Sequence, residues 1–133
     1  MGKDYDMLKK NKKSFKRFVK SFGYSGEGIK YAFYHEQNII VMFVIGILAI
    51  VLGLVFNITY TERLVVLLLT GMILSLELVN TAIEAVVNMH DGDKRSKYGK
   101  IAKDCASGAV SIASIFAAII GLLIFLPHIL KLF

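Results

Sequence analysis

The sequence lacks the residues on which several protein classes depend. Its 133 residues include one cysteine, one proline and no tryptophan. A single cysteine excludes a disulfide framework within the chain, and no cluster of His and Cys has the spacing of a zinc site. We also see no internal repeat, no low-complexity segment and no secretory signal with a small-residue cleavage site. A disulfide-stabilised domain and a zinc-binding module are therefore excluded.

What the sequence does contain is apolar residues in long uncharged runs. Hydrophobic residues make up 56% of the chain and the mean hydropathy is +0.61, which is too apolar for an ordinary soluble domain. Even the shortest of the three main runs, 39–56, would be about 27 Å long as a helix, close to the thickness of a bilayer core. We therefore predict an all-α membrane protein with spans of about 37–57, 62–90 and 101–127, because lipid forces each backbone polar group to be satisfied within its helix.

The charged residues are unevenly distributed along the chain. Basic residues are concentrated before residue 35 and again between residues 90 and 104, and the net charge is +6. Cytoplasmic segments of membrane proteins are enriched in Lys and Arg, so we expect the N-terminus and the 90–104 connection in the cytoplasm. With so apolar a remainder, the positive charge suits anionic headgroups or a phosphorylated ligand, and we expect no nucleic-acid partner.

The N-terminal region divides into two predicted parts. Residues 1–13 are basic and are expected to be flexible, whereas residues 14–133 are expected to form a single membrane domain. Residues 14–36 begin with apolar positions at helical spacing among lysines, which is typical of an amphipathic helix lying in the membrane interface. We expect a bend, before a second helical stretch, at Gly23, Gly26 and Gly28.

A polar stripe interrupts the second apolar run. In ELVNTAIEAVVN (77–88), four polar residues fall within an arc of about 80° on a helix: Glu77, Asn80, Glu84 and Asn88. Charged groups inside a bilayer cost several kcal/mol unless they pair or reach water. The stripe is either a set of hydrogen bonds between helices or a functional cluster. A third carboxylate at the entry to the first span, Glu36, and the Lys103–Asp104 pair at the start of the third favour the cluster.

Such a cluster has a chemistry of its own. Closely spaced carboxylates bind Mg²⁺, which usually takes phosphate oxygens as further ligands. A carboxylate at the edge of the lipid could accept a proton from a hydroxyl, and basic side chains could neutralise phosphate charge. The alternative is a small proton- or ion-conducting oligomer in which Glu77 and Glu84 relay charge. That alternative leaves Lys103 and Asp104 without a role.

Two motifs carry a resemblance to a known family. ELVNTAIEAVVN, followed by AKDCASGAV (102–110), resembles the signature of the small bacterial membrane lipid kinases, which comprise prokaryotic diacylglycerol kinase and the undecaprenol kinases of Gram-positive bacteria. The likeness extends over roughly 14–127. It implies three transmembrane helices and an interfacial helix in a homotrimer of the bacterial cytoplasmic membrane, with active sites shared between subunits.

The resemblance also implies a role for individual residues. Glu77 corresponds to the base that takes the proton from the lipid hydroxyl, and Glu36 and Glu84 to ligands of Mg²⁺. The residues implied to bind the co-substrate ATP are Arg17, Tyr24, Glu36, Glu84, Asp93, Lys94, Lys103 and Asp104. The residues implied to bind or support the lipid are Arg17, Lys30, Glu77, Asn80 and Asn88.

One departure from the family pattern concerns the last position of the first motif. The family usually carries Asp there, whereas this chain has Asn88, which keeps an acceptor oxygen and loses the negative charge. We interpret the change as tolerated, with lower activity as the competing interpretation. The ending GLLIFLP (121–127) resembles the Gram-positive branch, so undecaprenol is favoured over diacylglycerol as the lipid alcohol.

Overall fold

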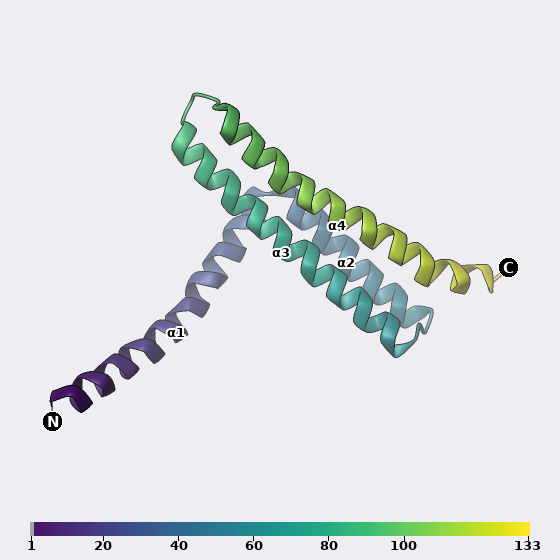
Figure 1. Ribbon diagram of the computed structural model, residues 1–133. Coiled ribbons are helices and arrows are strands. Elements are labelled where there is room, and N and C mark those ends of the chain that lie inside the picture. Colours follow the sequence, from purple (N-terminus) through teal and green to yellow (C-terminus); the bar gives the residue numbers. More distant parts are fainter. Residues whose placement is uncertain (1) are drawn as a thin grey trace. The chain divides into compact units, whose positions relative to one another are not determined.

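The computed structural model describes residues 2–133, except for five side chains near the N-terminus: Leu8, Lys10, Asn11, Lys12 and Lys13. No strand occurs within these residues. The helices are α1 (Gly2–His35), α2 (Gln37–Val55), α3 (Tyr60–Asp91) and α4 (Lys97–Leu130) (Figure 1). The contacts divide the chain into two units, Met1–His35 and Glu36–Phe133, and each is described by itself.

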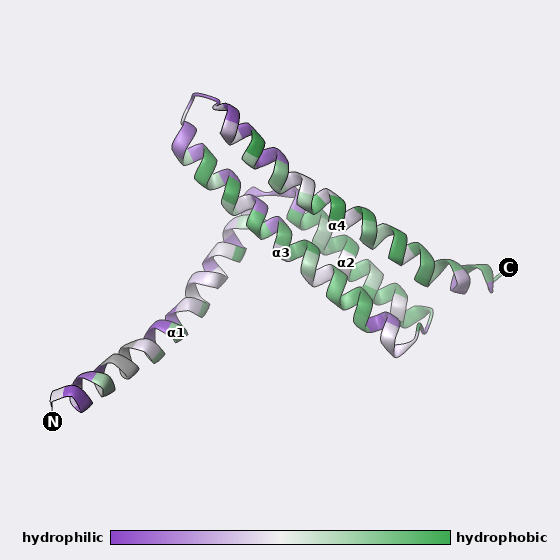
Figure 2. Ribbon diagram, in the orientation of Figure 1, coloured by the Kyte–Doolittle hydropathy of each residue, from purple (hydrophilic) through white to green (hydrophobic). Residues whose placement is uncertain are grey.

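The second unit contains three helices that are long and apolar enough to cross a membrane, α2, α3 and α4. The three predicted spans are confirmed in length and composition, although α3 and α4 extend further than the expected 62–90 and 101–127. The 32 residues of α3 would measure about 48 Å, so its ends project beyond a hydrocarbon core of about 30 Å. Figure 2 shows this division, with hydrophobic helix bodies and a hydrophilic connection between α3 and α4.

Helix α3 packs against both α2 and α4 in this unit. A small core of Ile58, Val66 and Ile124 lies near the connection between α2 and α3. There the rings of Phe56 and Phe125 meet edge to face with centroids 6.3 Å apart. This packing fixes the three helices at the end of the unit opposite the α3–α4 connection (Figure 1).

Local signals in the sequence explain where α3 and α4 begin. Thr59 and Glu62 form a capping box: the Thr59 backbone N–H donates to Glu62 Oε2 at 2.8 Å, and the Glu62 N–H donates to Thr59 Oγ1 at 3.2 Å. Ser96 Oγ accepts from the Gly99 N–H at 2.9 Å and caps α4. Between them, Gly92 ends α3 with φ +55°, a conformation that glycine adopts without strain.

Helix α1 forms the first unit and continues through its glycines. The prediction of a separate second helical stretch after Gly23, Gly26 and Gly28 is wrong, because one continuous helix runs from Gly2 to His35. The bend expected at these glycines stays a prediction. A glycine costs a helix only about 1 kcal/mol relative to alanine, too little to end it. The helix ends at His35, and Glu36, with an extended backbone (φ −114°, ψ 113°), separates it from α2. The flexibility expected of residues 1–13 stays a prediction, and Met1 lies outside the described residues.

Candidate active site

The polar stripe on α3 changes from buried to exposed along the helix. Glu77 is 3% exposed and Asn80 is 7% exposed, whereas Glu84 is half-buried and Asn88 is exposed. Thr81, also buried, donates from Oγ1 to the carbonyl oxygen of Glu77 at 2.9 Å. The stripe therefore leads from a carboxylate enclosed between helices to an amide at the open end of the unit.

Two further carboxylates come close to Glu77. The negative charges of Glu36, at the start of α2, and of Glu84, two turns along α3, both act on the Glu77 carboxyl group. The Glu36 side chain makes no capping hydrogen bond to α2, so its oxygens are available to a ligand. Glu36, just before α2, and Glu84, on α3, thus lie within electrostatic reach of the Glu77 carboxyl group.

The carboxylate and amide oxygens of these residues suit a hard cation that takes part of its coordination shell from water and a bound substrate. No group of three or more His, Cys, Asp or Glu in the described part of the chain is arranged to hold a metal ion by itself. Mg²⁺ usually binds through one or two carboxylates together with water and substrate phosphates. Asn80 Oδ1 is a buried oxygen with no hydrogen-bond partner, and it adds an oxygen to the same helix face. These oxygen donors fit Mg²⁺ bound together with a phosphorylated substrate.

Helices α3 and α4 are joined by a side-chain contact at this level. Lys103 Nζ donates to Asn88 Oδ1 at 2.6 Å, across 15 positions of sequence. Asp104 does not take part in this contact, because it accepts from Lys100 one turn earlier on the exposed face of α4. Lys103 is half-buried and points to the polar end of α3, so its ammonium lies beside the stripe.

A cavity of about 590 Å³ lies between the ends of α3 and α4. Its wall contains four basic side chains and two acidic ones, which leaves a net positive charge: Arg95, Lys97, Lys100, Lys103, Asp91 and Asp104. Of these six residues, only Lys103 and Asp104 are predicted from the sequence as site residues, from their place at the start of the third span and from the family resemblance. The basic residues Arg95, Lys97 and Lys100 are predicted only as part of a basic connection, and the Lys100–Asp104 spacing of four is the signal that could have identified Lys100.

Asp91 shapes this cavity and does not offer its charge to a ligand. Its carboxylate accepts from the Ser96 N–H at 3.1 Å and from Ser96 Oγ at 2.8 Å, and His90 Nδ1 lies 3.0 Å away. A side chain at Gly99 would overlap Asp91 and Ser96, so the close approach of the end of α3 to the first turn of α4 requires glycine at this position. Asp91 therefore ties the end of α3 to the first turn of α4.

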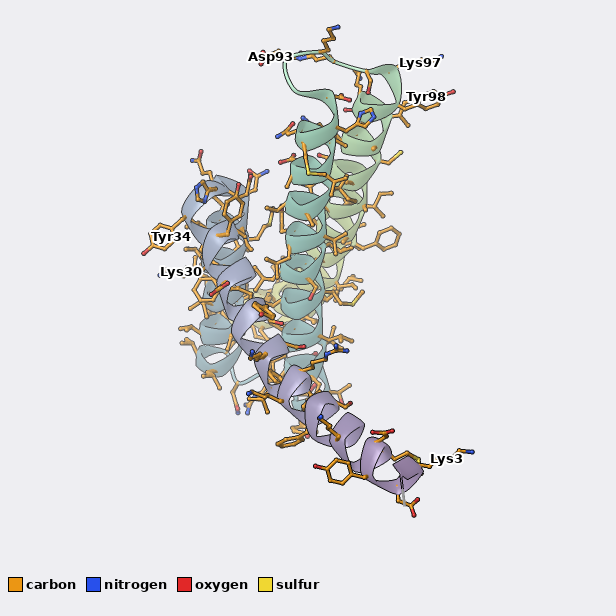
Figure 3. The ribbon with its side chains drawn as sticks, turned by 90° about the vertical axis from the view of Figure 1, so that its left-hand side faces the viewer. Lys3, Lys30, Tyr34, Asp93, Lys97 and Tyr98 are labelled. Atoms are coloured by element: carbon orange, nitrogen blue, oxygen red, sulfur yellow. The ribbon has the colours of Figure 1, made fainter. Side chains whose placement is uncertain are left out.

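The structure does not test several of the other predicted site residues. Asp93 and Lys94 are exposed in the connection and do not line the cavity. Figure 3 shows Asp93 in this connection. Arg17, Tyr24 and Lys30 are exposed on α1, where Lys30 Nζ lies 5.8 Å from the centre of the Tyr34 ring. Their contacts with a nucleotide or lipid stay predictions.

The sequence is similar to those of several bacterial lipid kinases. The family model of prokaryotic diacylglycerol kinase matches residues 23–125. The undecaprenol kinase of Bacillus subtilis (strain 168) is 38% identical over 119 residues, which cover 90% of this chain and 96% of that protein. The diacylglycerol kinase of Synechocystis sp. is 37% identical over 112 residues, covering 84% of this chain and 64% of that protein. The diacylglycerol kinase of Escherichia coli (strain K12) is 30% identical over 118 residues, covering 89% and 96%.

Proposed function

The chain belongs to the prokaryotic diacylglycerol kinase family and is a lipid kinase, and we propose that it transfers the γ-phosphate of ATP to the hydroxyl of a membrane lipid in the presence of Mg²⁺. The observation that carries this proposal is the approach of the Glu36 and Glu84 charges to the enclosed carboxyl group of Glu77. The ion-conducting oligomer is set aside, because it explains neither the family membership nor the basic cavity between the ends of α3 and α4.

Glu77 is the general base in the proposed reaction. It takes the proton of the lipid hydroxyl while that oxygen forms a bond to the γ-phosphorus, and the bond from phosphorus to the bridging oxygen breaks to release ADP. Its place between helices, 3% exposed, keeps water away from the reacting hydroxyl. The products are a lipid phosphate, ADP and a proton that leaves Glu77 for water.

Glu36 and Glu84 hold Mg²⁺ in this proposal. When bound, the ion neutralises charge on the phosphate oxygens and fixes their position. Asn80 supports the site through its unpartnered oxygen. This assignment is supported by the oxygen-only character of the donor set.

The basic cavity between α3 and α4 is the proposed site of the ATP phosphates. Lys103 contacts a phosphate, and Asp104 the ribose or the metal shell. Lys97 and Arg95 add positive charge in the cavity wall. Asp93 and Lys94 are proposed to reach the nucleotide from the connection, and Arg17 and Tyr24 from α1.

Undecaprenol is the proposed acceptor, and diacylglycerol is the alternative. The identity to an undecaprenol kinase is 38% against 37% and 30% to two diacylglycerol kinases, so it supports undecaprenol only slightly. We place the chain in the bacterial cytoplasmic membrane with its N-terminus in the cytoplasm, because basic residues are concentrated in α1 and around the α3–α4 connection. Helix α1 would lie in the membrane interface, and three copies would share their active sites.

A phosphorylation assay tests the proposal directly. Purified protein in detergent is incubated with γ-labelled ATP and undecaprenol, diacylglycerol or no lipid, with and without Mg²⁺. We expect label in the lipid only when lipid and Mg²⁺ are both present, and more with undecaprenol. Transfer of label to neither alcohol would contradict the proposed function, and faster transfer to diacylglycerol would reverse the choice of acceptor.

A further inference from the structure

Asp91 is the residue on which the connection between α3 and α4 closes. Its carboxylate accepts from the Ser96 N–H at 3.1 Å and from Ser96 Oγ at 2.8 Å, and its backbone carbonyl oxygen accepts from the Lys94 N–H at 3.0 Å. The Asp91 side chain is only 11% exposed, although residues 92–95 of the connection are exposed. One residue therefore closes the turn through both its side chain and its main chain.

The space around this carboxylate is filled by the first turn of α4. Gly99 is buried there, and its N–H donates to Ser96 Oγ at 2.9 Å, the same hydroxyl that donates to Asp91. An added side-chain carbon at this glycine would overlap Asp91, Ser96 and Val87. Hydrogen bonds and steric fit therefore fix the same contact independently of each other.

The contact lies on the same face of α4 as Lys103. Lys103 follows Ser96 by seven residues, which is close to two turns of helix and about 10 Å along its axis. From that face Lys103 Nζ reaches Asn88 Oδ1 at 2.6 Å, and Asn88 lies one turn before Asp91 on α3. The two contacts are thus successive links between the same two helix faces, and the first helps to set the register of the second.

We infer that Asp91 is a positioning residue for nucleotide binding, which holds the α3–α4 connection and Lys103 in place before ATP arrives. The inference rests on the proposed function, in which Lys103 and the connection contact the nucleotide. Ordering a flexible connection at the moment of binding costs free energy, and a connection that is already closed avoids that cost. The reacting atoms of the proposed reaction lie at Glu77, fourteen residues earlier and about 21 Å along α3. Loss of Asp91 therefore weakens the binding of ATP and leaves the chemical step unchanged.

Steady-state kinetics separates this role from a purely structural one. We expect Asp91→Ala to raise the KM for ATP about fivefold to tenfold and to change kcat less than about twofold. A loss of stability alone would reduce the fraction of folded enzyme, and with it the apparent kcat, and would leave the KM of the folded fraction unchanged. Ser96→Thr keeps the hydroxyl and should retain the original KM. Ser96→Ala keeps only the N–H donor, so its KM should rise less than that of Asp91→Ala.

A second variant disturbs the contact without removing any hydrogen-bonding group. Gly99→Ala places a methyl group against Asp91 and Ser96, and we expect a rise in the KM for ATP with the same small change in kcat. The matched control is Gly71→Ala, on an exposed part of α3 where an added carbon meets nothing within 4 Å. The KM of that control should equal the original value. If Asp91→Ala does not fold, Gly99→Ala and Ser96→Ala decide the outcome.

A third measurement needs no turnover. Hydrogen exchange followed by mass spectrometry reports how well the backbone of residues 92–96 is ordered in the full chain, in detergent and without nucleotide. We expect this segment to exchange faster in Asp91→Ala and Gly99→Ala than in the unaltered chain. Unchanged exchange in both variants, or an unchanged KM for ATP in both, would overturn the inference. Absence of ATP-dependent phosphate transfer in the unaltered chain would instead contradict the proposed function, and the inference would fall with it.

Discussion

Lys103 on α4 donates a hydrogen bond of 2.6 Å to the side-chain oxygen of Asn88 on α3, and its acceptor is neutral. A carboxylate at this position would form an ion pair with the same ammonium group. The other nearby acids are engaged: Asp104 with Lys100, and Asp91 with Ser96 and His90. Lys103 is thus held by a neutral partner, which in the proposed site leaves its charge to a phosphate.

Restoring the carboxylate should weaken nucleotide binding. We expect Asn88→Asp to raise the KM for ATP by about two- to fivefold, because ion pairs at partly exposed sites contribute about 0.2–1 kcal/mol. The effect should shrink in high salt, which screens the new pair. Steady-state kinetics at two salt concentrations measures it, with Asn88→Ala as the variant that removes the contact and adds no charge. A lower KM for ATP in Asn88→Asp would show that the missing charge is a defect.

Replacing the proposed base should abolish most of the turnover. Glu77→Gln keeps the size of the side chain and removes its basicity, and we expect kcat to fall about 10²- to 10⁴-fold. Phosphate transfer from labelled ATP measures this, together with size-exclusion chromatography to check that assembly is unchanged. Glu62→Gln, at the other end of α3, is the matched control, because Gln also serves in a capping box. Near-normal turnover in Glu77→Gln would remove Glu77 from the role of base.

The Mg²⁺ concentration that the reaction needs should rise when Glu36 or Glu84 is replaced. Chelation with EDTA is expected to abolish transfer and added Mg²⁺ to restore it. Glu36→Gln and Glu84→Gln should each raise the Mg²⁺ concentration for half-maximal activity by about tenfold or more, because changes around a metal commonly cost that much affinity. Mg²⁺ titration at saturating ATP provides the measurement. Unchanged titration curves in both variants would exclude these residues as ligands.

The tie between Asp91 and Ser96 should contribute to stability. Asp91→Ala removes the acceptor of two hydrogen bonds, and we expect it to lower the free energy of unfolding by about 1–2 kcal/mol. Ser96→Ala removes one of these bonds and the cap of α4, so the two effects should not add in the double variant. Denaturant unfolding in detergent measures all three. Additive losses would mean that the two residues act independently.

How far the sequence predicts this protein depends on the range of the interactions. The three spans follow from uncharged runs, and the polar face of α3 follows from spacing within one helix, because both are local properties. The bond between Lys103 and Asn88 depends on the register of α4 against α3, which packing at Val66 and Ile124 helps to set and which spacing does not reveal. The separate helical stretch expected after the glycines of α1 is not seen because local propensity is weak, and one helix runs on to His35 instead.

The contact between α2 and α3 at Gly46 has a consequence at the other end of α2. A single methyl group at position 46 would overlap Thr70 and act as a wedge, forcing the two helices apart. Glu36 lies ten residues before Gly46, about 15 Å away along α2. A tilt of α2 at this contact would move the Glu36 carboxylate relative to Glu77, so the arrangement of the acidic residues depends on glycine at position 46, near the middle of α2.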